Sequence, residues 1–421
     1  MLSDNAPSRL GGLRDLVARL SPGERVYLPG SAGETIGLAD ALCEEAAPPL
    51  ALTASYVPGI NPFPVAKLPP GTTLTSMFAQ PGAPRAQEAG VFRHIPLSYG
   101  TFGALLKSRR VNFDTAIVHV APPDAEGRCS LGPAVEFTPL ALACSRRVIG
   151  VINPQLPRLP HADSIAYADF ELVLELEGKL REYDVGAPSE QATVIAARIA
   201  EFVDDGTTLQ IGLGKVPDAL LRMLANRRKL RLHSGMLSDG ARVLVEAGAV
   251  DTEFLHTSCV HVGTMAYYAW LAERTDFAVR GCEVTHAASV LAGMRRLVAV
   301  NSALSVDLFG QANLEMLDGR MVSAVGGAAD FARAAALSAD GASIIALPAT
   351  SGRAENSRIV AKLDAPASIP RHDVQVLITE HGAADLRGCT VMERAERIIA
   401  VAAPKHRSDL TDAWREIAAR L

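Results

Sequence analysis

The sequence predicts an α/β protein built from two similar halves with largely parallel sheets. Three observations support this class. Short apolar runs alternate with stretches of helical apolar spacing, most runs end in a polar or glycine-rich turn, and one order of elements occurs twice in the 421 residues. Parallel sheets with helices on both faces bury their strands, which explains why the apolar runs are continuous rather than alternating.

The first half begins with the order helix, stop, strand, glycine-rich loop and helix. The spacing of apolar residues and the Gly and Pro positions set the boundaries of these elements. In chain order we expect a helix over Leu13–Leu20, a stop at Ser21-Pro22-Gly23, a strand over Arg25–Leu28, a tight loop over Gly30–Gly33 and a helix over Ile36–Cys43.

The second half repeats that order. Ser189 is a plausible helix start signal, and Pro217 suits the first turn of a later helix. We expect a helix over Val194–Val203, a stop at Asp204-Asp205-Gly206, a strand over Thr208–Ile211, the loop Gly212-Leu213-Gly214 and a helix over Pro217–Leu224. The repeated order indicates a duplicated construction, although similar βα units also arise by chance.

Further short apolar runs extend both sheets. Expected strands are Thr115–Val120, Arg147–Ile152, Leu297–Val300, Ser343–Leu347 and Val374–Ile378, and expected helices are Asp330–Leu337 and Val391–Ala402. The pattern breaks at Tyr183–Ser189, so we place one domain at residues 1–186 and a second at residues 187–421. Trp414 falls in a C-terminal amphipathic helix, where packing is the simpler interpretation of its role.

Composition excludes several classes of function. A net charge of −5 and only 5% aromatic residues give no basis for binding nucleic acid or an anionic membrane. The six cysteines form no Cys-x-x-Cys pair, which argues against a structural metal site and a disulfide framework. No apolar run is long enough to span a membrane and no signal peptide is recognisable, so we expect a cytoplasmic protein.

Two glycine pairs follow predicted strands and precede predicted helices. In open α/β sheets, ligands bind beyond the carboxyl ends of the strands. The amides of Gly212 and Gly214 could there stabilise an anion or a developing oxyanion, and Gly326-Gly327 forms a second such pair. The alternative for both pairs is a structural turn or close backbone packing.

Three polar segments carry candidate catalytic groups. His233 lies in one of them, although a single histidine is more often structural. Cys259 and His261 share a face if their segment is a strand, and could form an activated thiolate; a half-exposed strand or an interface is the alternative. His286 lies with Cys282 and Glu283 in a third cluster of the same ambiguity.

Several segments together resemble the acetyl-CoA hydrolase/CoA-transferase family, in the branch of 4-hydroxybutyrate and butyrate–acetate CoA-transferases. The similar segments are Val118–Gly132, Val151–Ile165, Asp204–Leu221, Asn301–Asn313, Val325–Ala335, Ser343–Val360 and Ile378–Gly388. The resemblance implies two NagB-like CoA-transferase domains, a homodimer, and a CoA thioester as substrate with no permanently bound cofactor. It also implies that Gly212 and Gly214 line the thioester site and that Gly326 and Gly327 lie against the pantetheine arm or acyl group.

The resembled family uses one glutamate as the nucleophile that forms acyl-glutamyl and glutamyl-CoA intermediates. That glutamate stands in a His-Thr-Glu-Met segment before Ser-Asp-Gly. This sequence has His233-Ser234-Gly235-Met236 before Ser238-Asp239-Gly240, so the catalytic position is Gly235. Other departures gather nearby: the family's GGQ is Gly326-Gly327-Ala328, its Thr-Glu-Tyr-Gly is Thr379–Gly382, and its Thr-Asn-Asp-Pro is near Thr285–Ala288.

Three hypotheses follow from this pattern. In the first, an acyl-CoA enzyme has lost the glutamyl-CoA route and performs acyl transfer, condensation, hydrolysis or decarboxylation, with His233, His261 or His286 as base or Cys259 as nucleophile. In the second, another carboxylate supports ordinary CoA transfer; the candidates are Glu136, Asp239, Glu283, Glu315 and Glu380. In the third, the chain binds acyl-CoA without turning it over.

Overall fold

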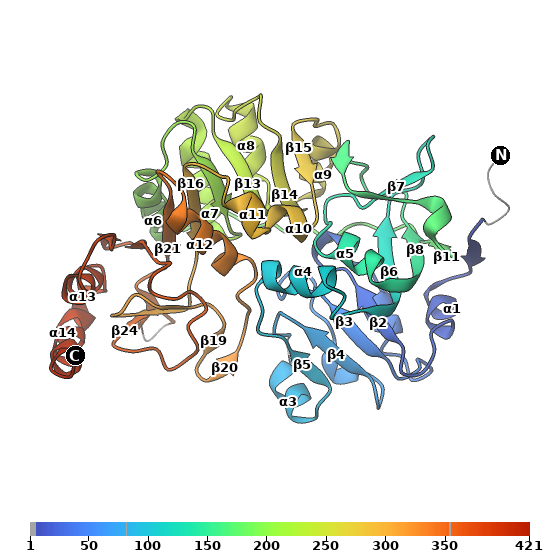
Figure 1. Cartoon of the computed structure of the whole chain (residues 1–421), viewed down its shortest axis with the longest axis horizontal. Coiled ribbons are helices and arrows are strands. Elements are labelled where there is room, and N and C mark those ends of the chain that lie inside the picture. Colours follow the sequence, from blue (N-terminus) through green and yellow to red (C-terminus); the bar gives the residue numbers. More distant parts are fainter. Residues whose placement is uncertain (1–5, 81, 353–354) are drawn as a thin grey trace. The chain divides into compact units, whose positions relative to one another are not determined.

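The computed structural model describes residues 6–80, 82–352 and 355–421, and its contacts divide the chain into two compact units (Figure 1). Unit 1 comprises Met1–Asp184 and Leu255–Ala287, and unit 2 comprises Val185–Phe254 and Ala288–Leu421. Helices and strands alternate in both units, which confirms the mixed α/β class. The chain first passes from unit 1 to unit 2 between Asp184 and Val185, close to the boundary expected at residue 186. The division into domains 1–186 and 187–421 stays a prediction.

Unit 1 is built on an eight-stranded sheet of order β1-β11-β8-β6-β2-β3-β4-β5, and all seven of its strand pairings are parallel. Its strands are β1 (Ser8–Leu10), β2 (Arg25–Leu28), β3 (Ala51–Ala54), β4 (Thr73–Ser76), β5 (Phe92–His94), β6 (Phe113–Val120), β8 (Ser145–Ile152) and β11 (Leu172–Glu175). The apolar run of β6 is buried over its last six residues, as expected for an inner strand of a covered parallel sheet.

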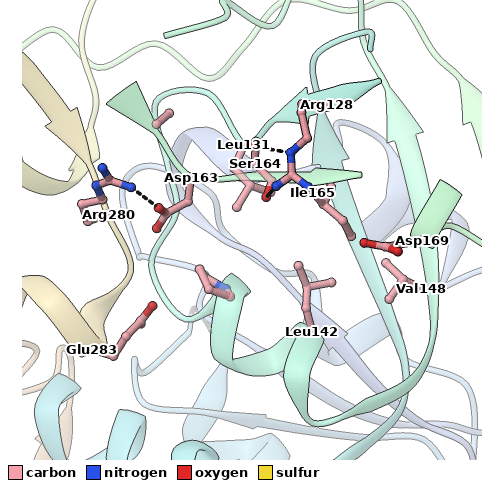
Figure 2. Close-up of a pocket in the computed structure, with 12 residues that line it drawn as sticks. Arg128, Leu131, Leu142, Val148, Asp163, Ser164, Ile165, Asp169, Arg280 and Glu283 are labelled. Atoms are coloured by element: carbon pink, nitrogen blue, oxygen red, sulfur yellow. Dashed lines mark hydrogen bonds and ion pairs between the residues drawn. The ribbon is translucent and has the colours of Figure 1, made fainter. Parts of the chain in front are cut away.

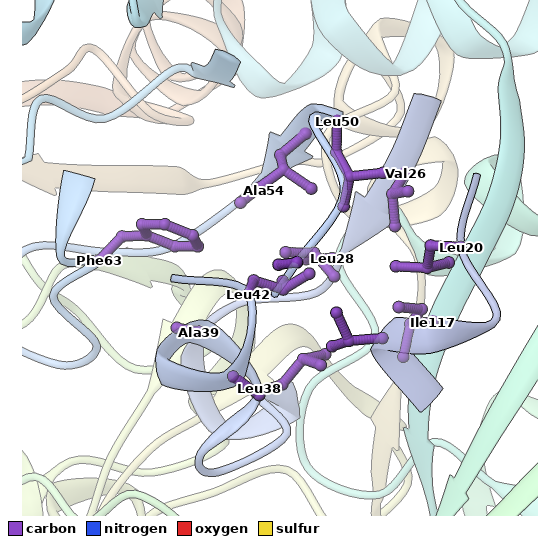
Figure 3. Packing of buried hydrophobic residues seen from close by; sticks show 14 of the residues in the cluster. Leu20, Val26, Leu28, Leu38, Ala39, Leu42, Leu50, Ala54, Phe63 and Ile117 are labelled. Atoms are coloured by element: carbon purple, nitrogen blue, oxygen red, sulfur yellow. The ribbon is translucent and has the colours of Figure 1, made fainter. Parts of the chain in front are cut away.

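Helices connect these strands and supply one wall of the core. They are α1 (Leu13–Ala18), α2 (Leu38–Ala41), α3 (Ala83–Glu88), α4 (Tyr99–Lys107) and α5 (Thr138–Ala143). In Figure 3, Leu38 and Leu42 of the α2 region lie against Leu28 of β2 and form part of a continuous apolar cluster. Helix α1 begins at Leu13 as predicted but ends at Ala18, with Arg19 as its C-cap. Helix α2 begins two residues later than predicted because Gly37, in the left-handed region, is its N-cap, and it ends at Ala41.

Residues Leu255–Ala287 belong to unit 1, although they lie in sequence between the two stretches of unit 2. They form β14 (His256–His261), α9 (Met265–Ala272), β15 (Phe277–Val279) and α10 (Cys282–Thr285). Strand β15 pairs in parallel with both β14 and β9 (His161–Ala162). The Asp163 amide also donates to the Val279 carbonyl at 3.1 Å, so two distant stretches of chain are joined by backbone hydrogen bonds. Strand β10 (Ser164–Ala166), which follows β9 in sequence, forms a short antiparallel pair with β7 (Arg128–Ser130).

Unit 2 contains the strand order β26-β25-β21-β16-β12-β13. The strands are β12 (Thr208–Ile211), β13 (Arg231–Leu237), β16 (Leu297–Asn301), β21 (Ala342–Ala346), β25 (Val376–Thr379) and β26 (Gly382–Asp385). Only the edge pair β25–β26 is antiparallel among the pairings described for these strands. Strands β16 and β21 are buried at every residue, which requires cover on both faces of the sheet.

The helices of unit 2 include α6 (Glu190–Ala200), α7 (Lys215–Met223), α8 (Gly240–Glu246), α11 (Ala288–Leu291), α12 (Ala328–Leu337), α13 (Val391–Ala400) and α14 (Arg407–Ala418). Ser189 caps α6 as expected, because its hydroxyl accepts from the Ala192 amide. Trp414 of α14 is buried and meets Phe309 edge-on at 5.5 Å, so its role is packing. Within the described ranges, every helix is too short or too polar to cross a lipid bilayer.

Candidate functional site

A cavity of about 260 Å³ opens in unit 2 beside the carboxyl ends of three parallel strands. Its walls come from the loop after β12, the residues that end β16 and β21, and the start of α6. We call it the glycine cavity; it is lined by Ser189, Gln191, Ala192, Gly212, Leu213, Gly214, Lys215, Val216, Pro217, Val300, Asn301, Ser302, Ala346 and Pro348. Gly212 and Gly214, which the sequence predicts as site residues, therefore line a cavity at the carboxyl ends of the strands.

The two glycines have different reasons to be glycine. Gly214 is the N-cap of α7 with φ of +123° and ψ of −178°, a region that essentially only glycine occupies. Gly212 has no such constraint, and a β-carbon placed on it would meet no atom within 4 Å. Because no side chain caps α7, its first amides remain available to an anion or an oxyanion.

Gly235 lies on β13, the strand next to β12 in the sheet. It directly follows Ser234, which is hydrogen-bonded to β12. The Ser234 hydroxyl donates to the Ile211 carbonyl at 2.8 Å, directly before Gly212. Alternation along β13 places Gly235 on the same face as His233. Position 235 is therefore next in sequence to a residue that is anchored at the cavity's edge.

His233 is buried and its ring lies 6.2 Å from the ring of Phe331. Phe331 belongs to α12, whose N-terminus is preceded by Gly326 and Gly327. Gly326 has φ of +55°, so a turn conformation that favours glycine accounts for it. The second glycine pair therefore precedes the helix whose Phe331 packs against His233.

The remaining catalytic candidates lie in unit 1. Cys259 and His261 sit on β14, which is a strand as expected but is buried rather than half exposed. Burial raises the pKa of the Cys259 thiol well above its ordinary value, and nearby Glu136 adds to the effect. A thiol in these surroundings stays protonated, which disfavours the activated thiolate considered from the sequence.

The two candidate histidines in unit 1, His261 and His286, also have defined partners. His261 Nδ1 lies 2.6 Å from the Tyr267 hydroxyl, while burial lowers the pKa of His261 to about 3. An imidazole with so low a pKa is neutral but a weak base. His286 Nδ1 lies 2.8 Å from the Thr285 hydroxyl, and its ring is 5.0 Å from that of Tyr99.

Glu136, one of the carboxylates considered from the sequence, is buried in unit 1 with two serine partners that the sequence did not indicate; we call this group the Glu136 cluster (Ser31, Ser55 and Glu136). The Ser31 hydroxyl donates to Glu136 Oε1 at 2.7 Å, and the Ser55 hydroxyl donates to Oε2. Burial raises the pKa of Glu136 even though both serines favour the ionised form. Ser31 and Glu136 have φ of +51° and +46°, which is uncommon for residues other than glycine.

Of the five carboxylates considered as replacement nucleophiles, four are engaged or enclosed. Glu136 is 1% exposed, Glu315 accepts from Ser368, and Glu380 accepts from Gln191 and Ala349. Asp239 stands at the N-cap position of α8 without a side-chain capping hydrogen bond, and its charge acts on Arg222. Glu283 differs, because its Oε2 atom is buried without a hydrogen-bond partner and its side chain lines a second cavity, in unit 1. Desolvation is the main cause that raises the pKa of Glu283.

Comparison with known proteins agrees with the resemblance in the sequence. Residues 263–414 match the acetyl-CoA hydrolase/transferase C-terminal domain. A 4-hydroxybutyrate coenzyme A transferase from Clostridium kluyveri is 32% identical over 79% of this chain and 79% of its own length. The chain belongs to the acetyl-CoA hydrolase/transferase family.

Two further proteins extend the match to the acetyl-CoA hydrolase/transferase family. A succinyl-CoA:acetate/propanoyl-CoA:succinate CoA transferase from Fasciola hepatica is 33% identical over 80% of this chain and 73% of that protein. The crystal structure of RipA from Yersinia pestis superposes with a TM-score of 0.88 at 27% identity, over 98% of each chain. Membership therefore places the chain among acyl-CoA transferases and hydrolases, and confirms the fold expected from the sequence.

Proposed function

We propose that the protein transfers the acyl group of an acyl-CoA thioester to water or a second substrate without a glutamyl-CoA intermediate. The observation that carries the proposal is the glycine at position 235, on the strand next to the glycine cavity. A glycine has no carboxylate with which to form an anhydride or a thioester, so the covalent route of the resembled family has no nucleophile there.

The glycine cavity supplies a place for the thioester carbonyl. As a nucleophile attacks, the carbonyl oxygen gains negative charge, and preorganised amides lower the energy of that state. The amides after Gly212 and Gly214 at the uncapped start of α7 are suited to this role. The carbon–sulfur bond then breaks, and CoA leaves as a thiolate that takes up a proton.

His233 is the candidate base. It shares a face of β13 with Gly235, so a water or acceptor that meets this face at position 235 would lie on the histidine's side of the strand. Neutral imidazole can take a proton from such a nucleophile near pH 7. Cys259 and His261 have no part in this proposal, because the thiol stays protonated and the imidazole is too weak a base.

The test is CoA release from a panel of acyl-CoA thioesters, measured as free thiol with and without acetate. We expect release that does not depend on acetate, and His233→Gln should lower kcat by about a hundredfold with little change in KM. His372→Gln, an exposed histidine in unit 2, is the matched control and should behave as the wild type.

Two results would overturn the proposal. Acetate-dependent transfer of CoA, with acyl exchange between acids, would show that another carboxylate runs the ordinary reaction. Calorimetric binding of CoA without turnover of any thioester, in the presence of water, amines or alcohols, would instead show a binding protein.

A further inference from the structure

We propose that unit 1 contains a second small-molecule site, for an organic ammonium ion with an apolar body, in which Glu283 binds the charged group. The site is a cavity of about 630 Å³, within the usual size range of small-ligand pockets (Figure 2). It is made wholly from residues of unit 1 and is separate from the glycine cavity of unit 2.

One wall of this unit 1 cavity is apolar. Leu142 and Val148 face it together in Figure 2, and Leu131 and Ile165 are buried beside them. These side chains can cover a hydrocarbon chain and remove it from water, at a gain of about 0.8 kcal/mol for each buried methylene.

Charged side chains lie around the rest of the lining: Figure 2 shows Arg280, Asp163 and Glu283 on one side, and Asp169 beside Val148. Arg280 Nη1 lies 2.6 Å from Asp163 Oδ1, and the Gly281 amide donates to the other oxygen of Asp163 at 3.0 Å, so this carboxylate is already neutralised. The guanidinium of Arg128 donates to the hydroxyl and carbonyl of Ser164. With Asp169 and Glu283 the lining contains three carboxylates and two guanidinium groups, which leaves an excess of negative charge.

One carboxylate oxygen of Glu283 lacks a hydrogen-bond partner in the described part of the chain. This Oε2 atom is buried and accepts no hydrogen bond from the described residues, although a buried carboxylate oxygen is costly to leave unpaired. After burial, which raises the pKa of Glu283, the next influence is a hydrogen bond from its own backbone amide, which lowers it; Asp163 and Lys107 then act in opposite directions. An ammonium group at this position would supply both the hydrogen bond and the opposite charge.

Gly281 allows the Glu283 carboxylate to take this position. A β-carbon on Gly281 would lie 2.3 Å from Glu283 Oε2 and 2.5 Å from Oε1. The glycine has φ of −62° and ψ of 163°, which alanine adopts without strain. Gly281→Ala should therefore move the carboxylate away without straining the backbone.

The experiment is isothermal titration calorimetry of the full chain with hexylammonium, hexanol and hexanoate, which share the apolar body and differ in charge. We expect hexylammonium to bind about tenfold more tightly than hexanol, and hexanoate to bind least. Glu283→Gln and Gly281→Ala should each reduce the tenfold difference to near unity. Glu175→Gln, an exposed carboxylate of unit 1 outside the cavity, is the matched control and should preserve it.

Three results would overturn the proposal. These are the absence of saturable binding, tighter binding of hexanoate than hexylammonium, or the same preference in both variants as in the wild type. Thermal unfolding of each variant shows whether it is folded, and Gly281→Ala keeps the test decisive if Glu283→Gln is not. CoA release is assayed separately, so failure here would leave the proposed reaction untouched.

Discussion

At the scale of single residues, two positions decide where a carboxylate could take part in the reaction: Gly235, which has none, and Glu136, whose carboxylate is buried. Gly235 leaves the strand beside the glycine cavity without an acid, while Glu136 is an acid enclosed in unit 1 with two serine donors. Enclosure at 1% exposure keeps a thioester from reaching Glu136 in this structure, so we assign it a structural role.

The titration of Glu136 gives a prediction for stability. Its folded-state pKa is raised above the ordinary 4.5, so above pH 4.5 the folded chain binds more protons than the unfolded chain. Stability should therefore fall as pH rises through the interval from 4.5 to the folded-state pKa, by about 1.4 kcal/mol for each unit of separation. Glu136→Gln removes this dependence, and urea unfolding from pH 4 to 8 measures it. Parallel stability curves for wild type and variant would contradict the prediction.

Cys259 provides a second residue-scale prediction. Its buried, protonated thiol should react slowly with a colorimetric disulfide reagent in the native protein, after the half-buried Cys43 and Cys389. Cys259→Ala should retain most of the CoA-release activity, because the proposed reaction does not use the thiol. Rapid inactivation that peptide mapping traces to Cys259 would show that the thiol is exposed and needed.

At the scale of elements, the loop between β12 and α7 contains two glycines that are needed for different reasons. Gly214 is needed for its backbone conformation, and Gly212 for the space that it leaves open. Gly214→Ala places a side chain at φ of +123° and should lower stability by about 1 to 3 kcal/mol. Gly212→Ala meets no atom within 4 Å and should leave the melting temperature unchanged while its methyl group enters the cavity. CoA release should fall by about ten- to a hundredfold in the Gly212 variant. Equal effects of the two variants on stability would contradict this distinction.

Most elements could be predicted because local sequence determines them. The strands Arg25–Leu28 and Thr208–Ile211 occur with the expected bounds, since each is an apolar run between glycine-rich or polar turns. The glycines that line the cavity could be found for the same reason, as they follow a strand and precede a helix.

The Glu136 cluster and the Glu283 cavity could not be predicted in this way. Each joins segments far apart in sequence, such as Ser31 with Glu136 and Asp163 with Arg280. The positive φ of Glu136 is imposed by tertiary contacts rather than by residue type. Burial of β14 on both faces was also missed, because its polar residues indicated partial exposure.

At the scale of the whole molecule, unit 1 is built from two stretches of chain that are separated in sequence by part of unit 2. Residues 255–287 complete unit 1, where the Cys282 amide donates to the Glu136 carbonyl at 2.8 Å and β15 pairs with β9. A chain of residues 1–184 alone should therefore unfold over a broad range of urea concentration.

A matched chain tests this point about unit 1. Joining residues 1–184 to residues 255–287 through a long Gly/Ser linker should restore a sharp transition and a higher midpoint, because it returns β15, which pairs with β9, and β14, which pairs with β15. Circular dichroism during urea unfolding measures both chains. Equal cooperativity of the two would contradict the assignment of residues 255–287 to unit 1.

The central claim is that no carboxylate of this chain carries CoA during the reaction. The most direct measurement is intact-mass analysis and peptide mapping after incubation with acyl-CoA, with and without borohydride, which reduces a glutamyl thioester to an alcohol. We expect an unmodified chain that nevertheless releases CoA. A CoA adduct, or a carboxyl side chain reduced at Glu283 or any other acidic residue, would contradict this claim.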